Sequence, residues 1–465
     1  MKSKIAEQLE DIMGKEYTRF HMPGHKGRKL FNIDWFNYDF TEIYGSDNLG
    51  DPKGVIKEVL EDIANIYGAR QSFMLVNGST TGIIASLMSV CKPGDSFVIP
   101  RNSHRCVYSG MILRQINPIY IYPTLCKEYA YSLAINPKEV ERLFLQYPEC
   151  KGIIITSPTY YGTCSDIETI LKITHKYNKI LIVDEAHGSH FIFNHRFPES
   201  AISIGADIVV QSTHKVLNAM TQTGILHIGS SAIDARELGK NINLIQSSSP
   251  SYPLLISIEN ALRHAEKEGE AILDRIINYY DIIQRALRGY PYILLGKNLI
   301  GKECISGFDW MKIWITHENL SGKLVDKLLR DRYNIQMELS DKVTFLGLMG
   351  MGTQKQDIYK LIYALHEIAE GNKGLPNRKQ QQIHYPTLIA VMAPWEAYCR
   401  RKNFIALKDS VNEVSGDFII PYPPGIPLVV PGELLSKEII MVIQELGLEE
   451  IMGLDSQGRI CILER

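Results

Sequence analysis

The sequence lacks the features that would place a protein in a membrane or on a secretory route. Its apolar runs, such as Ile153–Ile155 and Ile180–Val183, are far shorter than the ~18 residues that a membrane-spanning helix needs. The first residues are charged and amphipathic, without the apolar core of a signal peptide. We therefore expect no membrane association and a cytoplasmic location.

The sequence also lacks a paired-cysteine pattern and an excess of positive charge. Its 8 cysteines are scattered and form no CxxC pair, so neither a disulfide framework nor a thiolate zinc site is indicated. Lys and Arg total 50 against 52 Asp and Glu, giving a formal charge of −2. That balance offers no basic surface to a nucleic acid. Over 465 residues, a hydrophobic fraction of 45% and a charged fraction of 22% are typical of a folded globular protein.

Short apolar runs alternate with amphipathic segments between about residues 50 and 230. This alternation is typical of βαβ units and predicts an α/β fold with a mostly parallel sheet. One helix is expected to begin with Asp51 as N-cap and Pro52 at the first position, and to end at Gly68. A long helix is expected from about residue 251 to 287. The predicted strands are 73–76, 97–99, 119–122, 153–156, 180–183 and 208–211.

Beyond about residue 290 the alternation becomes looser, which predicts a smaller α+β part. The polar segment Gly371–Gln382 is the best candidate for an internal linker. We therefore expect an N-terminal segment 1–50, a large domain 51–290, a small domain 291–370 and a C-terminal domain 371–465.

A glycine turn with hydroxyl groups follows the first predicted strand. Gly78, Ser79 and Thr80 precede an apolar helix pattern, and N–H groups at a helix N-terminus together with hydroxyls make an anion site, most often for phosphate. The alternative is an ordinary capped helix start. The segment contains neither GxGxxG nor GxxxxGK[ST], so dinucleotide and P-loop nucleotide binding are disfavoured.

Two further strands end in groups that carry chemistry. Asp184 ends a buried strand pattern, at the sheet edge where α/β proteins bind ligands, although it is equally suited to cap a helix. Lys215 follows the strand 208–211, and a sheltered lysine of lowered pKa can bond to an aldehyde, whereas most lysines lie on surfaces. Asp184, His187 and His190 match no metal-binding spacing, so no metal is expected.

The three segments together match what pyridoxal 5'-phosphate (PLP) requires of a protein. The phosphate needs an anion site, the aldehyde needs an amine, and the ring nitrogen needs a carboxylate that keeps it protonated as an electron sink. Ser79, Lys215 and Asp184 each meet one requirement. The sequence therefore predicts PLP as cofactor.

Motifs spread over nearly the whole chain resemble one family of PLP enzymes. They are His21–Gly27 (HMPGHKG), Gly45–Leu49 (GSDNL), Pro100–His104 (PRNSH), Asp184–His187 (DEAH), Ser212–Lys215 (STHK), Ser249–Tyr252 (SPSY) and Tyr422–Glu433 (YPPGIPLVVPGE). The chain resembles the fold type I PLP enzymes and, among them, the bacterial ornithine/lysine/arginine decarboxylases. The resemblance implies a mostly parallel central sheet with a smaller α+β C-terminal domain.

The resemblance also implies roles for individual residues. Lys215 would be the Schiff-base lysine and Asp184 would bind the pyridine nitrogen, with His104 and His214 as further catalytic groups. Among the substrate-binding candidates, Glu433 is our first prediction for the distal cation and Asp47 the second. The residues expected to bind the cofactor are Ser79, Thr80, His104, Asp184, Ala186, His187, Ser212, His214 and Lys215.

The expected reaction is decarboxylation of arginine, lysine or ornithine to an amine that serves polyamine synthesis. Lys215, His214 or a tyrosine would return a proton to Cα. An aminotransferase on the same fold is the leading alternative, and a non-catalytic PLP-binding regulator is the other. The large family members have an N-terminal receiver-like domain that this sequence does not show before residue 21. We therefore expect a homodimer, with higher oligomers in doubt.

Overall fold

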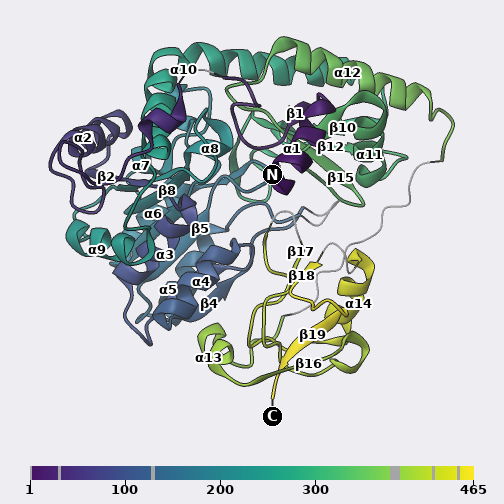
Figure 1. Ribbon diagram of the computed structural model, residues 1–465. Helices are drawn as coiled ribbons and strands as arrows, with labels where there is room; N and C mark the ends of the chain where they lie inside the picture. Colours follow the sequence, from purple (N-terminus) through teal and green to yellow (C-terminus); the bar gives the residue numbers. More distant parts are fainter. Residues whose placement is uncertain are drawn as a thin grey trace.

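The computed structural model describes residues 3–29, 33–126, 131–376, 388–421, 425–447 and 451–464. A seven-stranded sheet forms the centre of the large body (Figure 1). Its strands, in spatial order, are β2 (Gln71–Leu75), β9 (Gly224–Ile228), β8 (Ile208–Ser212), β7 (Ile180–Asp184), β5 (Gly152–Thr156), β3 (Ser96–Pro100) and β4 (Asn117–Ile121).

The predicted α/β architecture is confirmed. From β8 to β4 the neighbouring strands are parallel, whereas β9 is antiparallel to both β2 and β8. All six predicted strands are present, and β9 is the member of this sheet that the sequence pattern did not identify. The helices of this body are α2 (Val55–Tyr67), α3 (Gly78–Val90), α4 (Arg105–Arg114), α5 (Pro137–Gln146), α6 (Ile167–Lys176), α7 (Ala201–Ile204), α8 (Thr213–Val216), α9 (Ala235–Ile245) and α10 (Tyr252–Ala286).

The start of α2 differs from the prediction, while its end agrees with it. The helix begins at Val55 with Gly54 as N-cap, so Asp51 is not the capping residue. The side chain of Asp47 accepts hydrogen bonds from the N–H groups of Gly54 (2.8 Å) and Ile56 (2.9 Å). The start of the helix is thus bound by a residue that precedes the predicted helix. Gly68 ends the helix with φ +65°, a left-handed conformation that glycine adopts readily.

A smaller α+β part follows α10 along the chain. Its four-stranded sheet has the order β10 (Tyr292–Leu294), β12 (Lys312–His317), β15 (Thr344–Leu348) and β14 (Leu339–Ser340), with helices α11 (Gly322–Tyr333) and α12 (Lys355–Glu370). Two strand pairs attach this part to distant segments. The pairs are β11 (Ile305–Phe308) with β6 (Thr163–Ser165), and β13 (Ile335–Met337) with β1 (Thr18–Phe20), which follows α1 (Lys4–Gly14).

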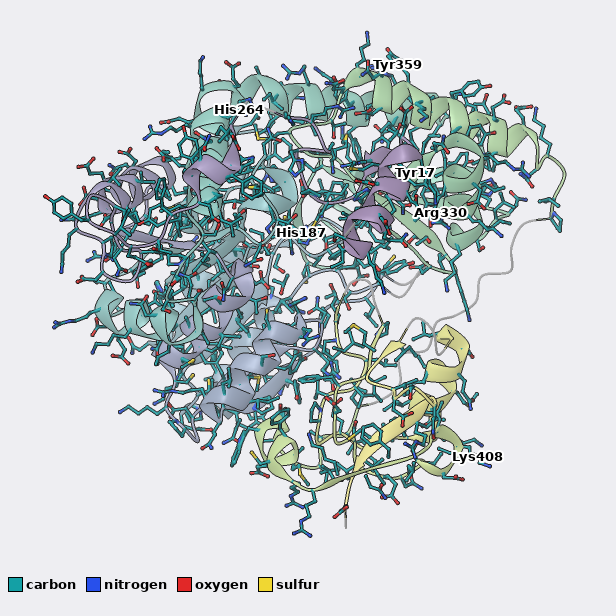
Figure 2. All side chains as sticks on the ribbon, viewed as in Figure 1. Tyr17, His187, His264, Arg330, Tyr359 and Lys408 are labelled. Atoms are coloured by element: carbon teal, nitrogen blue, oxygen red, sulfur yellow. The ribbon has the colours of Figure 1, made fainter. Side chains whose placement is uncertain are left out.

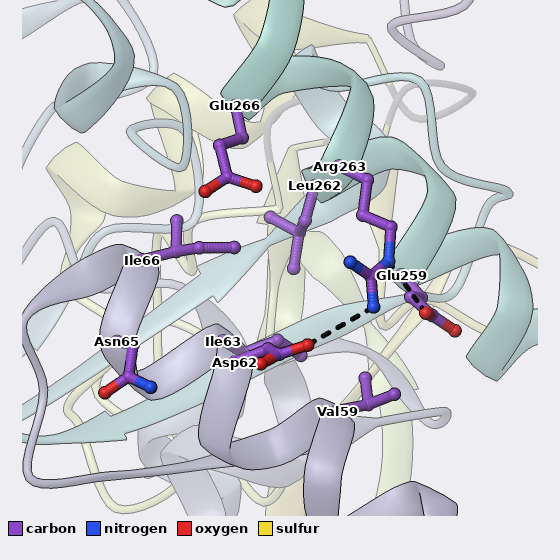
Figure 3. A pocket seen from close by; sticks show the side chains of 9 residues that line it. All are labelled: Val59, Asp62, Ile63, Asn65, Ile66, Glu259, Leu262, Arg263 and Glu266. Atoms are coloured by element: carbon purple, nitrogen blue, oxygen red, sulfur yellow. Dashed lines mark hydrogen bonds and ion pairs between the residues drawn. The ribbon is translucent and has the colours of Figure 1, made fainter.

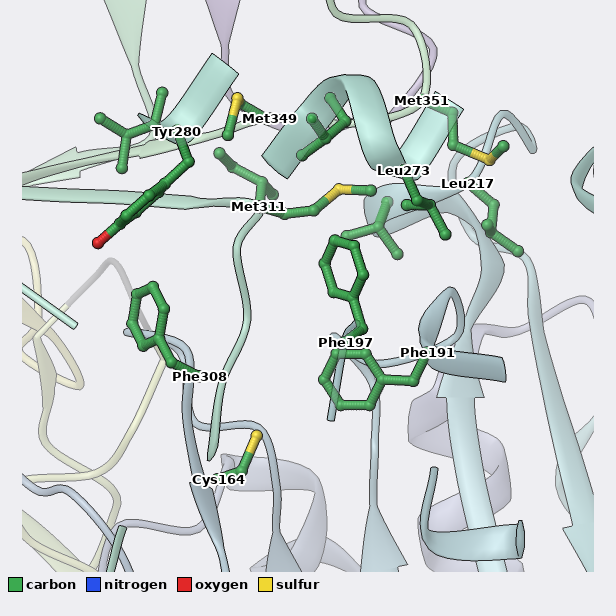
Figure 4. Close-up of a cluster of buried hydrophobic side chains, with 14 of the residues drawn as sticks. Cys164, Phe191, Phe197, Leu217, Leu273, Tyr280, Phe308, Met311, Met349 and Met351 are labelled. Carbon is green, nitrogen blue, oxygen red and sulfur yellow. The ribbon is translucent and has the colours of Figure 1, made fainter. Parts of the chain in front are cut away.

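One hydrophobic core joins the large body to the smaller part. Phe191 and Phe197 from the large body lie in the same buried cluster as Phe308, Met311 and Met349 (Figure 4). Each such side chain contributes about 1.5–3 kcal/mol when it is fully buried. The two parts are therefore held together by packing, and residues from both can meet in one site.

The C-terminal part has a separate core. It contains α13 (Pro394–Cys399), β16 (Lys402–Ala406), β17 (Ile420–Pro421), α14 (Lys437–Leu446), β18 (Ile451–Met452) and β19 (Arg459–Leu463), drawn in yellow-green and yellow in Figure 1. Its buried cluster, which includes Val429, Ile439 and Ile460, is distinct from the core above. The predicted linker falls between α12 and this part, and its residues 377–382 lie outside the described residues. Within the described ranges, no helix is long and apolar enough to cross a membrane.

Candidate active site

The carboxyl ends of neighbouring strands bring the predicted groups to one edge of the large sheet. Thr156 at the end of β5 is the register partner of Asp184 at the end of β7. The next strand, β8, ends at Ser212 and leads directly into α8, which carries Lys215. Asp184 is buried and Lys215 is partly buried, and each influences the pKa of the other. The structure therefore brings these two groups to one edge of the sheet, and their roles there stay predictions.

The hydroxyl groups predicted to bind phosphate lie together. The hydroxyl of Ser212 donates to that of Ser79 over 2.9 Å, at the start of α3. Asn77 occupies the N-cap position of α3 but makes no side-chain capping hydrogen bond, so the capped-start alternative does not apply. An uncapped N-terminus of a 13-residue helix beside two hydroxyls suits the phosphate of PLP. Burial lowers the pKa of nearby His214 to about 4, and its Nδ1 lies 2.8 Å from the carbonyl oxygen of Thr223.

Asp184 has the environment expected of a carboxylate that binds a ring nitrogen. Its side chain is 4% exposed, and Oδ1 accepts a hydrogen bond from the N–H of Ala186 at 3.2 Å. Burial raises its pKa, while the nearby Lys215 ammonium and the Ala186 N–H oppose that rise. A buried carboxylate without a cation in direct contact can gain much from a protonated partner. The donor set thus fits the pyridine ring of PLP.

His104 offers a neutral ring on the same edge of the sheet. It is the N-cap of α4, and its Nδ1 accepts a hydrogen bond from the N–H of Cys106 at 3.3 Å. Burial, assisted by the cations Lys215 and Arg105, lowers its pKa to about 4, so the imidazole is uncharged near neutral pH. An uncharged aromatic ring is suited to stacking on a planar cofactor.

His187 lies between the buried Lys312 and the partly buried Lys215. Its Nε2 is 3.2 Å from Nζ of Lys215, and its Nδ1 is 2.9 Å from Nζ of Lys312. Lys312 opens strand β12 in the smaller part, so the two cations approach the ring from different parts of the chain. The edge of the Tyr160 ring packs against the imidazole with centroids 5.0 Å apart. Figure 2 shows His187 in the interior of the molecule, near the middle of the fold.

Sequence reasoning missed Lys312 and Glu338. The Glu338 carboxylate accepts hydrogen bonds from the Met22 N–H (2.8 Å) and from the hydroxyl of Tyr160, and it influences the pKa of both Lys215 and Lys312. A signal for Lys312 was present, because it opens a strand whose six residues are all buried. A lysine in such a strand is rare and indicates a function or a partner.

The HMPGHKG segment forms a loop that contacts the backbone on either side of Lys215. The N–H of Gly24 donates to the carbonyl oxygen of His214 at 2.8 Å. A Cβ atom at Gly24 would lie 2.3 Å from the carbonyl oxygen of Leu217, so only glycine permits this approach. Lys26 in the same loop donates to the carbonyl oxygen of His21 at 2.6 Å.

Glu433 and Asp47, predicted to bind the substrate, have partners within the chain. The Glu433 carboxylate is 1% exposed and forms a buried ion pair with Arg101 at 2.8 Å. The Asp47 carboxylate accepts hydrogen bonds from four backbone N–H groups, which, against an opposing effect of desolvation, lower its pKa to about 2. Their role toward a substrate stays a prediction. In the YPPG segment before Glu433, residues 422–424 lie outside the described residues, and the carbonyl oxygen of Gly425 accepts a hydrogen bond from the N–H of Arg105 at 3.3 Å.

A separate surface groove between α2 and α10 contains none of these groups. Figure 3 shows that its guanidinium, from Arg263, reaches two acids on its walls. Arg263 binds Glu259 at 2.8 Å and Asp62 at 3.2 Å. The guanidinium of the groove is thus paired with acids of the groove itself. The groove is distinct from the sheet edge that carries Lys215.

Comparison with solved structures defines the fold. The chain is similar to a lysine decarboxylase from Francisella novicida, with a TM-score of 0.75 and 21% identity over 90% of this chain and 73% of that one. It is also similar to the ureidoglycine-glyoxylate aminotransferase of Bacillus subtilis, with a TM-score of 0.58 and 14% identity over 77% of this chain and 95% of the other. The fold is therefore that of the fold type I PLP-dependent enzymes.

Comparison of sequences defines the family. The model of the Orn/Lys/Arg decarboxylase major domain matches residues 5–290, and that of the C-terminal domain of the same family matches residues 377–449. A protein named arginine decarboxylase from Bacillus anthracis is 30% identical over 95% of this chain and 91% of its own. The constitutive lysine decarboxylase of Escherichia coli is 24% identical over 92% of this chain and 74% of its own. The chain belongs to the Orn/Lys/Arg decarboxylase family, a family of amino-acid decarboxylases, and the predicted resemblance is confirmed.

Proposed function

We propose that the chain uses PLP to decarboxylate a basic L-amino acid: arginine, lysine or ornithine. The observation that carries the proposal is the meeting of Asp184, Lys215 and the Ser79–Ser212 hydroxyl pair at one sheet edge. Arginine is the first substrate to test, because relatives that share 30% identity with the chain are named arginine decarboxylases.

The residues that would hold PLP follow from the fit described above. PLP supplies an electron sink that stabilises the charge left on Cα when CO₂ departs. Asp184 would hold a proton on the ring nitrogen, and Lys215 would anchor the aldehyde carbon. The imidazole of His104 and the methyl group of Ala186 would contact opposite faces of the cofactor ring and exclude water from it. The phosphate would be held by Ser79, Thr80, Ser212 and His214, with His187 beside the ring.

Proton return to Cα remains assigned to Lys215, His214 or a tyrosine, and the structure supports Lys215 best. Its Nζ lies 3.2 Å from His187, which gives it a neighbour able to exchange protons. The Nδ1 of His214, in contrast, is engaged with the Thr223 carbonyl at 2.8 Å. A proton donor is effective when its pKa lies near the working pH, and burial lowers the pKa of Lys215 toward that range.

Three acids are proposed for the distal cation of the substrate. Glu433 and Asp47 follow from the sequence, and Glu338 is added because its charge acts on Lys215 and Lys312. For Glu433 to bind a substrate guanidinium, that group must compete with Arg101, which already donates to both carboxylate oxygens. Desolvated cations require such carboxylate partners.

We also propose that the chain forms a homodimer. In the N-terminal region Phe36 is 91% exposed and Tyr44 is fully exposed, while α1 has no buried residue although it carries Ile5 and Leu9. Large apolar side chains this exposed favour a surface that another protein covers, and a second copy is the occupant that the family resemblance implies. Sedimentation should give a dimer, and Phe36→Ser with Tyr44→Ser should shift it toward monomer.

The proposal includes a cytoplasmic location and a product amine that serves polyamine synthesis. All 8 cysteines are free in the structure, which is typical of proteins in a reducing compartment.

Product analysis tests the proposed reaction directly. The purified chain, loaded with PLP, is incubated separately with arginine, lysine and ornithine, and products are identified by mass spectrometry. An amine together with one CO₂ per substrate is expected for at least one of the three. A keto acid would instead indicate an aminotransferase and would contradict the proposal.

A further inference from the structure

The contacts of His187 restrict how much positive charge the site can hold. A neutral imidazole has one N–H donor and one acceptor nitrogen, whereas an ammonium group has only donors. His187 lies within hydrogen-bond distance of Lys215 on Nε2 (3.2 Å) and of Lys312 on Nδ1 (2.9 Å). If both contacts are hydrogen bonds and the ring is neutral, one lysine must be an uncharged amine. If the ring is charged, both must be. The three groups then carry at most one positive charge.

The surroundings place that charge on Lys312. Its Nζ lies 5.5 Å from the centroid of the Tyr160 ring, a contact that favours an ammonium group. The carboxylate of Asp309, whose Oδ2 makes no hydrogen bond within the described residues, raises the pKa of Lys312 against the larger effect of burial. Burial with these partners leaves that pKa at about 8, so the group is charged at neutral pH.

The geometry points to Lys312 as a positioning residue for the proposed reaction: it donates to Nδ1 of His187, fixes the ring proton on Nε2 and keeps the Lys215 amine neutral. A neutral amine has the lone pair with which lysine bonds to a carbonyl carbon, whereas the ammonium form does not. The inference rests on the proposed function for its purpose, but its charge assignment can be tested without substrate.

Other titratable groups face this trio from each element packed against it. From α8 and the start of α4 they are His214, His104 and Cys106, and from β7 the carboxylate of Asp184. From the smaller part they are Asp309 and Glu338, and from the loops and strand around Tyr160 they are Tyr160, Cys164 and, in the HMPGHKG loop, Lys26. The two acids nearest Lys312 stabilise its charge, and Asp184 opposes the loss of charge from Lys215. Removing Lys312 should therefore let Lys215 take up the shared proton.

Trace labelling of lysines in the full chain freed of cofactor tests this assignment. The chain is exposed briefly to isotopic acetic anhydride at a series of pH values, and the label on the Lys215 peptide is measured by mass spectrometry. In Lys312→Met the midpoint of Lys215 labelling should rise by about one pH unit. Lys312→Arg, which keeps a cationic donor, should restore the wild-type midpoint.

A second variant and a matched control keep the test decisive. Lys312→Gln removes the charge but keeps a polar side chain. It should raise the Lys215 midpoint as Lys312→Met does, and it serves as the test if Lys312→Met does not fold. Lys26 is also a buried cation, yet it donates to the carbonyl oxygen of His21 and not to His187. Lys26→Met should therefore leave the midpoint within about 0.3 units.

The result that overturns the inference is an unchanged Lys215 midpoint in a folded Lys312→Met or Lys312→Gln chain. An equal shift in Lys26→Met would overturn it too, because it would show a general effect of charge removal. Neither result depends on the reaction catalysed. If amino acids are decarboxylated but the midpoint does not move, the inference alone fails. If the midpoint moves but no amine forms, the proposed function alone fails.

Discussion

Two buried clusters of charge in this molecule contrast in how their charges are satisfied. Arg101 donates to both oxygens of Glu433 and to the carbonyl oxygens of Pro427 (2.8 Å) and Leu428 (3.0 Å). Burial opposes its charge, yet Tyr108 and Glu433 raise the pKa of Arg101 above its ordinary value. Every donor direction has an acceptor, and the cluster joins the C-terminal part to the segment that carries His104.

The cluster of Lys215, His187 and Lys312 has the opposite character. Both lysines contact the same imidazole, and burial lowers the pKa of each. A saturated ion pair holds structure, whereas cations whose pKa is lowered by burial are poised for proton transfer and bond formation. The contrast separates a structural use of buried charge from a chemical one, and each variant below is aimed at one of the two.

The largest effect is expected for Lys215→Ala. Losing the amine proposed to anchor the cofactor should reduce turnover on the order of 10³-fold or more. Borohydride reduction of the wild-type chain with PLP, followed by peptide mapping, should attach the cofactor to Lys215. Lys26→Ala should keep that label. A label on any other lysine would contradict the assignment.

Arg101→Met should produce the largest loss of stability. It leaves the Glu433 carboxylate buried without its partner, at a cost of about 3–5 kcal/mol in the free energy of unfolding of the part that contains it. Denaturant unfolding measures the loss. The double variant Arg101→Met with Glu433→Leu should recover most of it, and a double variant as unstable as the single one would show that the pair is not the cause.

Asp184→Asn should lower turnover by about 10²–10³-fold while PLP stays bound. The amide cannot hold a proton on the ring nitrogen by charge, and the loss of such an electrostatic contact costs about 3–4 kcal/mol in the barrier. Steady-state kinetics and the cofactor absorbance of the same sample give the two readouts. Near-normal turnover at full occupancy would show that another group holds the nitrogen.

The smallest effect is a difference in pH response between the clusters. The folded pKa of Lys312, about 8, lies below the ordinary value of 10.5. The unfolded chain then binds more protons between these values, so Lys312 destabilises the fold below pH 8 and this contribution disappears as pH rises toward 10.5. The free energy of unfolding of Lys312→Met minus that of the wild type should therefore be more favourable at pH 7 than at pH 10.5, by an amount on the order of 1–3 kcal/mol. A stability difference independent of pH would contradict the lowered pKa.

The contrast also explains what could be predicted from the sequence. Asp184 and Lys215 were identified because each follows its own buried strand, and parallel strands end at a common edge whatever the rest of the fold does. Lys312 was missed because its partner, His187, lies 125 residues away in the sequence, and the pattern of neither segment shows which distant residue it meets. Gly54, not Asp51, caps α2 for the same reason: the deciding contact comes from Asp47, outside the helix pattern.

The close approach of Gly24 has a consequence for how the protein is made. The N–H of Gly24 binds the carbonyl oxygen of His214, and its own carbonyl oxygen accepts a hydrogen bond from the N–H of Gly352. The loop at residues 21–27 is thus fixed between a segment near residue 214 and one near residue 352, which is translated much later. These two hydrogen bonds of Gly24 cannot both form until residue 352 has left the ribosomal exit tunnel. Chains released before that point should carry the sheet but no competent cofactor site.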